Sequence, residues 1–226
     1  MNRSYFIAYI FSLLLLLSCN DNKSRDTAGE QEADKQTAVD STTRFKTIIF
    51  FGNSITAGYG VDPTEAYPAL IQNIVDSLKL NYKVINAGVS GETSSGGNGR
   101  IDWILRQPVD VFVLELGGND GLRGIPLGET KKNLQAIIDK VKAKYTGAKI
   151  VLEGMQIPPN MGQTYAREFK NIYPELAEKN NIALIPFLLK NVGGDVKLNQ
   201  QDGIHPTPEG HKIVAKTVWD VLKNSL

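Results

Sequence analysis

The sequence predicts an α/β fold in which a parallel sheet of about five strands lies between two layers of helices. Short apolar runs of β-favouring residues alternate with segments of helical spacing across residues 44–226. The run from Val109 to Leu116 is broken only by Glu115, which is typical of a strand covered on both faces. This alternation favours right-handed crossovers between parallel strands, and therefore a three-layer α/β/α sandwich.

The first half of the domain opens with a buried strand at 48–51, which Gly52 ends. A second strand is predicted at 82–86, and a loop rich in glycine and serine follows it over 87–99. Between the strands, a helix is predicted over 67–80 because five apolar residues recur on one helix face: Leu70, Ile71, Ile74, Val75 and Leu78.

The second half continues the alternation. In chain order we expect a strand at 109–116, a helix at 134–141, a strand at 149–152, a helix at 165–179, a strand at 182–185 and a helix at 208–222. Pro208 suits the first turn of the closing helix, because its fixed backbone angle is already helical there. The chain has 226 residues, 42% of them hydrophobic, which is enough for one domain with a sizeable core.

The first 19 residues are typical of an export signal. Arg3 precedes a short apolar run from Tyr5 to Leu17, which predicts a signal peptide rather than a membrane span. Cys19 follows at a boundary that resembles a bacterial lipobox, in which the thiol is acylated and becomes the first residue of the mature protein. The alternative is an ordinary signal with a chance cysteine. We expect an exported lipoprotein of the cell envelope, anchored on a periplasmic or outer face.

Residues 20–43 are rich in Asp, Glu, Lys, Gln, Ser and Thr and lack hydrophobic periodicity, which predicts a disordered tether. Cys19 is the only cysteine of the sequence, so an intramolecular disulfide and a thiolate metal cluster are excluded. The formal net charge of +1 gives no indication of a nucleic-acid partner. The acidic residues and the two histidines show no metal-ligand spacing, so neither a metal nor a cofactor is expected.

Ser54 follows the first strand in the stretch Phe51-Gly52-Asn53-Ser54. Open α/β sheets bind their ligands at the carboxyl ends of the strands, so this serine is a candidate nucleophile. A helix-capping role is the alternative. Similar polar turns follow the second strand, at 86–94, and the third, at 117–121.

The sequence has two histidines, His205 and His211. His205 stands three residues after Asp202 and directly before Pro206, so one local turn can bring the carboxylate onto the imidazole ring. A purely structural Asp–His pair is the alternative. His211 has helical spacing within the closing helix, where a packing or surface role is expected.

These turns together resemble the SGNH (GDSL-type) hydrolase family. Gly52-Asn53-Ser54 matches its Gly-Asp-Ser block, 86–94 its glycine block, Gly117-Gly118-Asn119-Asp120 its Gly-x-Asn-Asp block, and Asp202-Gly203-Ile204-His205 its Asp-x-x-His block. The four blocks occur in the family's order over the whole domain. Gly117 to Gly124 and Ile172-Tyr173-Pro174 are similar to the bacterial thioesterase, lysophospholipase and arylesterase branch. The resemblance implies a flavodoxin-like fold.

The resemblance also implies roles. Ser54 would be the nucleophile, His205 its general base and Asp202 the residue that orients the base. The Ser54 amide, the Gly91 amide and the Asn119 side chain would form the oxyanion hole. By residue type Ser90, Ser94 and Ser95 are rival nucleophiles, but their glycine-rich loop is better suited to shaping that hole.

Two positions depart from the family pattern: Asn53 stands where the family usually has Asp, and Glu92 where this branch often has Asp. The loop from Leu122 to Leu127 is mostly apolar and follows Asn119, so we expect Leu122 and Ile125 to line an acyl pocket. No G-x-S-x-G elbow occurs, which argues against the α/β-hydrolase arrangement that carries it.

The expected activity is hydrolysis of acyl esters, lysophospholipids or acyl thioesters by a monomeric serine esterase. A deacetylase of cell-envelope glycans would use the same machinery, with a polar, aromatic-rimmed groove in place of an apolar pocket. A non-catalytic surface lipoprotein that keeps the fold as a binding module is the alternative from another class, although no proposed site residue is missing.

Overall fold

The computed structural model describes residues 44–226; the predicted signal peptide, the lipidation site Cys19 and the tether 20–43 lie outside the described residues. The five strands are β1 (Lys46–Gly52), β2 (Tyr82–Gly88), β3 (Val111–Glu115), β4 (Lys149–Glu153) and β5 (Ala183–Ile185). The helices are α1 (Ser54–Ala57), α2 (Tyr67–Ser77), α3 (Ser94–Ile104), α4 (Gly118–Leu122), α5 (Leu127–Lys144), η1 (Pro159–Met161), α6 (Gln163–Asn180), α7 (Pro208–Leu222) and η2 (Lys223–Ser225).

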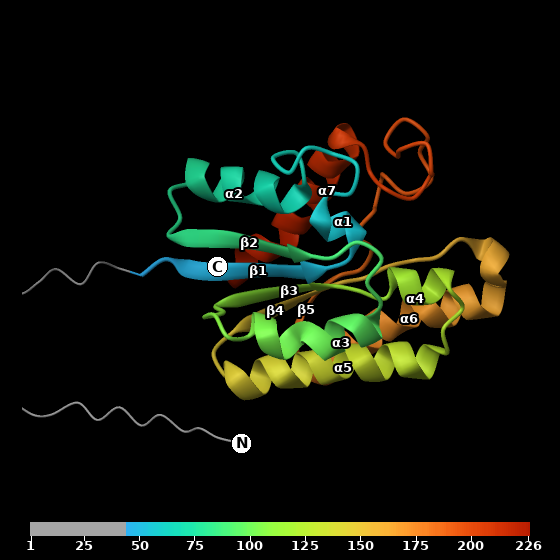
Figure 1. Cartoon of the computed structure of the whole chain (residues 1–226), viewed down its shortest axis with the longest axis horizontal. Helices are drawn as coiled ribbons and strands as arrows, with labels where there is room; N and C mark the ends of the chain where they lie inside the picture. Colours follow the sequence, from blue (N-terminus) through green and yellow to red (C-terminus); the bar gives the residue numbers. More distant parts are fainter. Residues whose placement is uncertain (1–43) are drawn as a thin grey trace, which may run out of the picture. The chain divides into compact units, whose positions relative to one another are not determined.

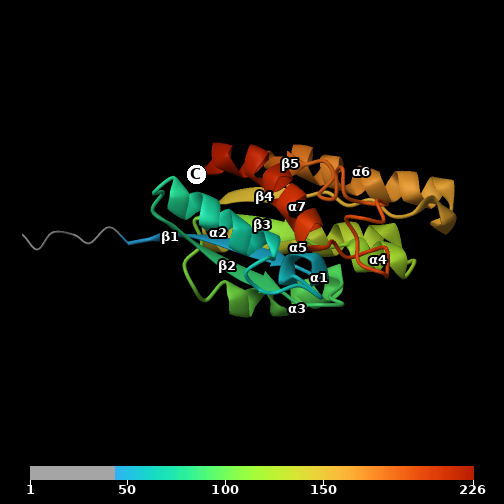
Figure 2. The same cartoon turned by 90° about the horizontal axis from the view of Figure 1, so that it is seen from above.

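All five strands pair in parallel, in the order β2-β1-β3-β4-β5. Helices α2 and α7 cover one face of this sheet, and α3, α5 and α6 cover the other (Figure 1 and Figure 2). The prediction of a three-layer α/β/α sandwich with about five parallel strands is confirmed.

The core follows from the composition of the strands. Every residue of β3 is buried, as are the last five residues of β1, because helices cover both faces of these central strands. The helices of each layer contribute apolar stripes, such as Ile71 and Val75 of α2 and Ile137 and Val141 of α5. No helix among the described residues is both long enough and apolar enough to span a bilayer.

The prediction of a loop over 87–99 is wrong in its second half, because α3 begins at Ser94. The Thr93 hydroxyl caps this helix by accepting a hydrogen bond from the Gly96 amide, at 3.3 Å. A β-carbon at Gly97 would lie 2.3 Å from Leu116 Cδ1, so the missing side chain lets α3 pack closely on the sheet. Tertiary packing therefore outweighs the poor helix propensity of the glycines.

The strand order reverses between β1 and β3, where the crossovers lead to opposite faces of the sheet. Doubly wound sheets bind ligands in the crevice outside the carboxyl ends of the strands at such a point. Here β1 ends at Gly52 beside Glu115, the last residue of β3. Ser54 follows β1 and Asn119 follows β3, so two candidate site residues begin at this reversal.

Candidate active site

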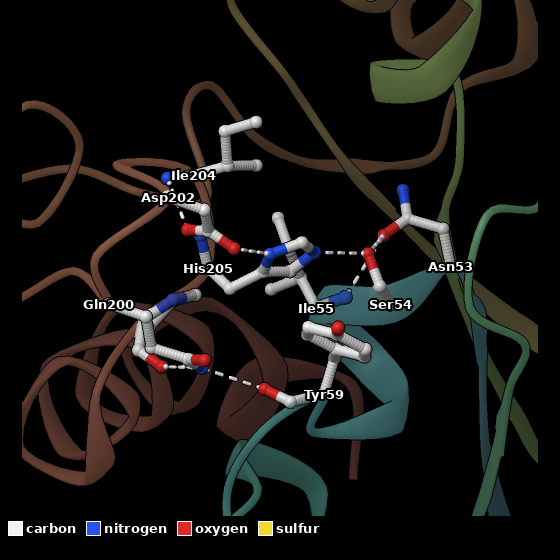
Figure 3. Close-up of polar contacts among 9 residues, drawn as sticks. Asn53, Ser54, Ile55, Tyr59, Gln200, Asp202, Ile204 and His205 are labelled. Carbon is white, nitrogen blue, oxygen red and sulfur yellow. Dashed lines mark hydrogen bonds and ion pairs between the residues drawn. The ribbon is translucent and has the colours of Figure 1, made fainter.

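Ser54, His205 and Asp202 form a continuous hydrogen-bonded chain (Figure 3). His205 Nε2 lies 2.8 Å from Ser54 Oγ, and His205 Nδ1 lies 2.6 Å from Asp202 Oδ2. A carboxylate at Nδ1 fixes the proton there and leaves Nε2 as the acceptor for the serine hydroxyl. Residues 151 positions apart are thus brought into the arrangement that activates a serine for nucleophilic attack.

The Asp202 carboxylate is oriented by its own loop. Its Oδ1 accepts hydrogen bonds from the Ile204 amide at 2.9 Å and the His205 amide at 3.0 Å. Partial burial opposes ionisation of Asp202, but the hydrogen bonds from the His205 ring and from these amides outweigh it and lower its pKa to about 2. Asp202 is therefore an anion throughout the neutral range and can orient the imidazole.

Two residues that were not singled out in the sequence support His205. The Tyr59 ring packs on the imidazole, with ring centroids 4.7 Å apart. Gln200 connects the segment of Tyr59 with that of His205. Its side-chain Nε2 donates to the Tyr59 carbonyl at 2.7 Å, and its backbone N–H donates to the His205 carbonyl at 2.7 Å (Figure 3). The loop that carries the base is thereby tied to the segment that follows the nucleophile.

Ser54 is the first residue of α1, and Asn53 caps this helix. Asn53 Oδ1 accepts from the Ile55 amide at 3.0 Å and lies 3.5 Å from Ser54 Oγ. The other end of the amide, Nδ2, donates to Glu115 Oε1 at 2.6 Å. Asn53, Ser54 and Glu115 are all buried, with exposed fractions of 3%, 8% and 0%. The residue that precedes the nucleophile is thus hydrogen-bonded to a buried carboxylate.

The three proposed oxyanion donors lie on segments that follow β1, β2 and β3. Asn119 belongs to α4 and Gly91 to the loop between β2 and α3. Asn119 Nδ2 donates to the Glu92 carbonyl at 2.9 Å, and its second N–H is available for a ligand. Arg123, one helical turn further along, donates to the Gly91 carbonyl at 3.1 Å. Two side chains of one helical turn therefore hold successive carbonyls of the loop that carries the Gly91 amide.

The Glu92 side chain holds the other side of this loop. It forms a two-point ion pair with the Arg100 guanidinium, which also donates to the Ala87 carbonyl at 2.7 Å. The guanidinium lies over the Phe51 ring, 4.0 Å from the centroid. Glu92 therefore joins the loop to α3.

The rival serines have other surroundings. Ser94 is fully buried, and its amide donates to Asp120 Oδ2 at 2.8 Å. Ser90 and Ser95 are exposed. His211 is buried, and its Nδ1 accepts from the Tyr67 amide at 3.3 Å. Within residues 44–226, no cluster of His, Cys, Asp and Glu has the arrangement of a metal site.

A cavity of about 420 Å³ opens beside the nucleophile, and Ile55, the neighbour of Ser54, forms part of its wall. The rest of the wall is mostly apolar and includes Leu122, Met155, Ile157, Phe187, Leu189 and Ile204. Of the two residues predicted to line an acyl pocket, Leu122 lies on this wall. Ile125 is not among the lining residues; its carbonyl accepts from the Tyr165 hydroxyl at 2.7 Å.

The fold and this site define an α/β ester hydrolase with a Ser–His–Asp arrangement. Residues 50–213 match the model of the GDSL-like Lipase/Acylhydrolase family, and the chain belongs to this family.

Esterase TesA of Pseudomonas aeruginosa is 38% identical over 179 residues, which cover 79% of this chain and 88% of that protein. Thioesterase 1/protease 1/lysophospholipase L1 of Escherichia coli is 37% identical over 170 residues, which cover 75% of this chain and 79% of that protein. A crystal structure of TesA matches with a TM-score of 0.77 at 38% identity, over 80% of this chain and 100% of that one. The chain is accordingly a carboxylic ester hydrolase of the SGNH type.

Proposed function

We propose that the protein hydrolyses acyl esters and thioesters through an acyl-enzyme on Ser54. The observation that carries this proposal is the hydrogen-bonded chain from Ser54 Oγ through His205 to Asp202, with contacts of 2.8 and 2.6 Å. Ser54 Oγ attacks the acyl carbonyl while His205 Nε2 takes its proton. The Ser54 amide, the Gly91 amide and the Asn119 side chain stabilise the oxyanion.

Collapse of the tetrahedral intermediate breaks the bond to the leaving group, and His205 returns the proton to the departing alcohol or thiol. A water molecule then attacks the acyl carbonyl while His205 accepts its proton; the bond between the acyl carbon and Ser54 Oγ breaks, His205 returns the proton to Oγ, and the acid is released. The imidazolium formed in each half-reaction is stabilised by Asp202, whose pKa of about 2 keeps it anionic.

The substrate class proposed is a fatty acyl ester, an aryl or short-chain ester, a lysophospholipid or an acyl thioester. The apolar wall beside Ser54 supports an acyl chain as the part of the substrate that is bound. The names of the TesA and thioesterase 1/lysophospholipase L1 relatives agree with this class. A glycan deacetylase is less favoured, because the cavity walls lack the polar, aromatic-rimmed character such a groove needs.

The test is hydrolysis of p-nitrophenyl esters from acetyl to palmitoyl by the full chain and by Ser54→Ala. We expect activity in the wild type and loss of it in Ser54→Ala, while the chain-length profile separates acetyl removal from lipid hydrolysis. Equal activity of the two proteins contradicts the nucleophile assignment. Inactivity of both towards the whole series, and towards lysophospholipid and acyl-thioester substrates, favours a binding lipoprotein.

We also propose that the protein is an exported, monomeric lipoprotein anchored through Cys19 in the cell envelope. The apolar run from Tyr5 to Leu17 followed by Cys19, the only cysteine, supports the export and the anchor. Cells fed an alkyne fatty acid should label the wild type and Ser54→Ala equally and leave Cys19→Ala unlabelled. Labelling of Cys19→Ala, or an unlabelled wild type, excludes this anchor.

A further inference from the structure

A carboxylate buried beneath the nucleophile has no part in the mechanism above. Glu115, the last residue of β3, is fully buried. Its Oε2 accepts from the Asn53 amide at 3.0 Å and from the Thr56 hydroxyl at 2.9 Å, and its Oε1 accepts from Asn53 Nδ2 at 2.6 Å. Among residues 44–226, no Lys, Arg or His forms an ion pair with Glu115. The carboxylate is thus held by hydrogen-bond donors.

The close approach of the Glu115 carboxylate to the Asn53 backbone depends on Gly52, at the end of β1. Gly52 pairs with Glu115 in the sheet register, and a β-carbon at Gly52 would lie 2.6 Å from Glu115 Oε2 and 2.1 Å from Thr56 Oγ1. The space below the turn therefore exists only because residue 52 has no side chain. The carboxylate fills that space and reaches the amide that precedes the nucleophile.

Glu115 also decides which way the Asn53 amide faces. An ionised carboxylate accepts hydrogen bonds only, so it requires the NH₂ end of the amide on its side. The oxygen end is then directed to the Ile55 amide, at 3.0 Å, and to Ser54 Oγ, at 3.5 Å. If the amide were reversed, its oxygen would face the carboxylate and its NH₂ would face the Ile55 N–H, and the cap of α1 would be lost.

We propose that Glu115 is a positioning residue for the Ser54 hydroxyl, acting through Asn53, and that an amide at position 53 lets it act as an unprotonated carboxylate. An aspartate at position 53 has the same shape but no donor. Two carboxylates at the distance between Asn53 Nδ2 and Glu115 Oε1, 2.6 Å, have to share a proton. The inference rests on the proposed role of Ser54 and concerns how that hydroxyl is held.

The surrounding groups leave Glu115 as the one charge of this cluster. The Tyr67 hydroxyl of α2 contacts Thr56 and donates to Glu153 Oε2 of β4, both at 2.9 Å. Burial is the main cause, and the charge of Glu115 the second, that raises the pKa of Glu153 well above its usual range. Glu153 is therefore neutral. Burial likewise raises the pKa values of Tyr67 and of Tyr173 in α6, which keeps both hydroxyls protonated.

The same burial raises the pKa of Glu115 to about 7, against the hydrogen bonds from Asn53 and Thr56 that favour its anion. Protonation on Oε1 would set an O–H against the N–H of Asn53, and the amide would have to turn. Asn53 therefore stays correctly oriented above neutral pH. In Asn53→Asp, by contrast, the shared proton is lost as the pH rises, and the two like charges separate.

The experiment is a swap of donor and acceptor, read as kcat with p-nitrophenyl butyrate from about pH 6 to about pH 9. Glu115→Gln presents an amide that cannot match all three donors, so kcat should fall by about tenfold or more with little change in KM. Asn53→Asp should be active near neutral pH and lose activity by about tenfold per pH unit on a new alkaline limb.

The double variant Asn53→Asp/Glu115→Gln restores complementarity with the polarity reversed, because the amide introduced at position 115 can donate to the carboxylate introduced at position 53 and accept from Thr56. We expect its kcat to exceed that of Glu115→Gln by about tenfold, without the alkaline limb. Glu153→Gln is the matched control: it changes another fully buried strand-end carboxylate that touches Tyr67 but not Asn53, and kcat should be unchanged.

Ser54→Ala is measured alongside. Retained activity in that variant overturns the nucleophile assignment, and this inference with it. Loss of activity in Ser54→Ala combined with a wild-type kcat in Glu115→Gln overturns the inference alone. So does a double variant that is no better than Glu115→Gln, or an Asn53→Asp profile that has no alkaline limb.

Discussion

The ring of Tyr59 lies against the imidazole of His205, with centroids 4.7 Å apart and planes inclined by 45°. Removing the ring in Tyr59→Ala should lower kcat by about tenfold, because the imidazole loses a wall that limits its rotation. Steady-state kinetics on p-nitrophenyl butyrate measures this. Tyr59→Phe keeps the ring and should retain the rate. A wild-type kcat in Tyr59→Ala would mean that Asp202 alone suffices to hold the base.

Arg123 should affect the reaction through the loop that it holds rather than through charge on the substrate. Its guanidinium donates to the Gly91 carbonyl at 3.1 Å, so Arg123→Ala should lower kcat by about tenfold with KM little changed. Arg123→Lys should recover part of the loss, and Arg106→Ala, at an exposed arginine after α3, is the control. A loss confined to KM with anionic substrates would instead assign Arg123 to substrate binding.

Chain-length preference should depend on Leu122 and not on Ile125. Leu122 lies on the cavity wall, whereas Ile125 does not. Leu122→Asp should therefore penalise octanoyl esters more than acetyl esters, by about tenfold in the ratio of kcat/KM, because a buried methylene contributes about 0.8 kcal/mol. Ile125→Asp should leave that ratio unchanged. Equal losses for both esters in Leu122→Asp would remove the acyl chain from this cavity.

The free energy of unfolding should fall as the pH rises from about 4.5 to about 6.5, because two buried carboxyl groups act in one direction and one buried histidine acts in the other. Burial raises the pKa of Glu115 from 4.5 to about 7 and the pKa of Glu153 well above its usual range, so the contributions of both carboxyl groups fall as the pH rises through that window. Burial, as the main cause, and the charge of His205 lower the pKa of His211 from 6.5 to about 4. The contribution of His211 to the free energy of unfolding is therefore lost as the pH falls. The pKa of Asp202, about 2, lies below this range.

Urea denaturation at several pH values separates the two contributions. In Glu115→Gln the remaining effects of Glu153 and His211 should largely cancel, and in His211→Gln the two glutamates should make stability fall more steeply with pH than in the wild type. Each group should contribute at most about 3 kcal/mol over the window. Two variants that both follow the wild-type curve would contradict these opposing pKa shifts.

The sequence was sufficient for the five parallel strands and for the helices α2, α5, α6 and α7, because apolar periodicity is a local property. Asp202 and His205 are three residues apart, and one turn brings them together, so this pair was also predictable. The helix α3 was missed since its glycines disfavour a helix on their own. The contact that reverses this preference, Gly97 beside Leu116, joins residues that are distant in the sequence.

The support for the nucleophile was harder to predict for the same reason. In the sequence Glu115 is only an interruption of an apolar strand, and Asn53 only a departure from a motif. They lie 62 positions apart and meet because β1 and β3 are neighbours. Arg123 and Tyr59 likewise act on segments that the fold, rather than the local sequence, brings beside them.

The direction of β1 separates the amino end of the described domain from the active site. The described chain joins the sheet at Lys46, and the seven residues of β1, a rise of about 20 Å, lead to Gly52 and the nucleophile (Figure 1). The amino end of the described domain therefore lies at the end of β1 opposite to the nucleophile.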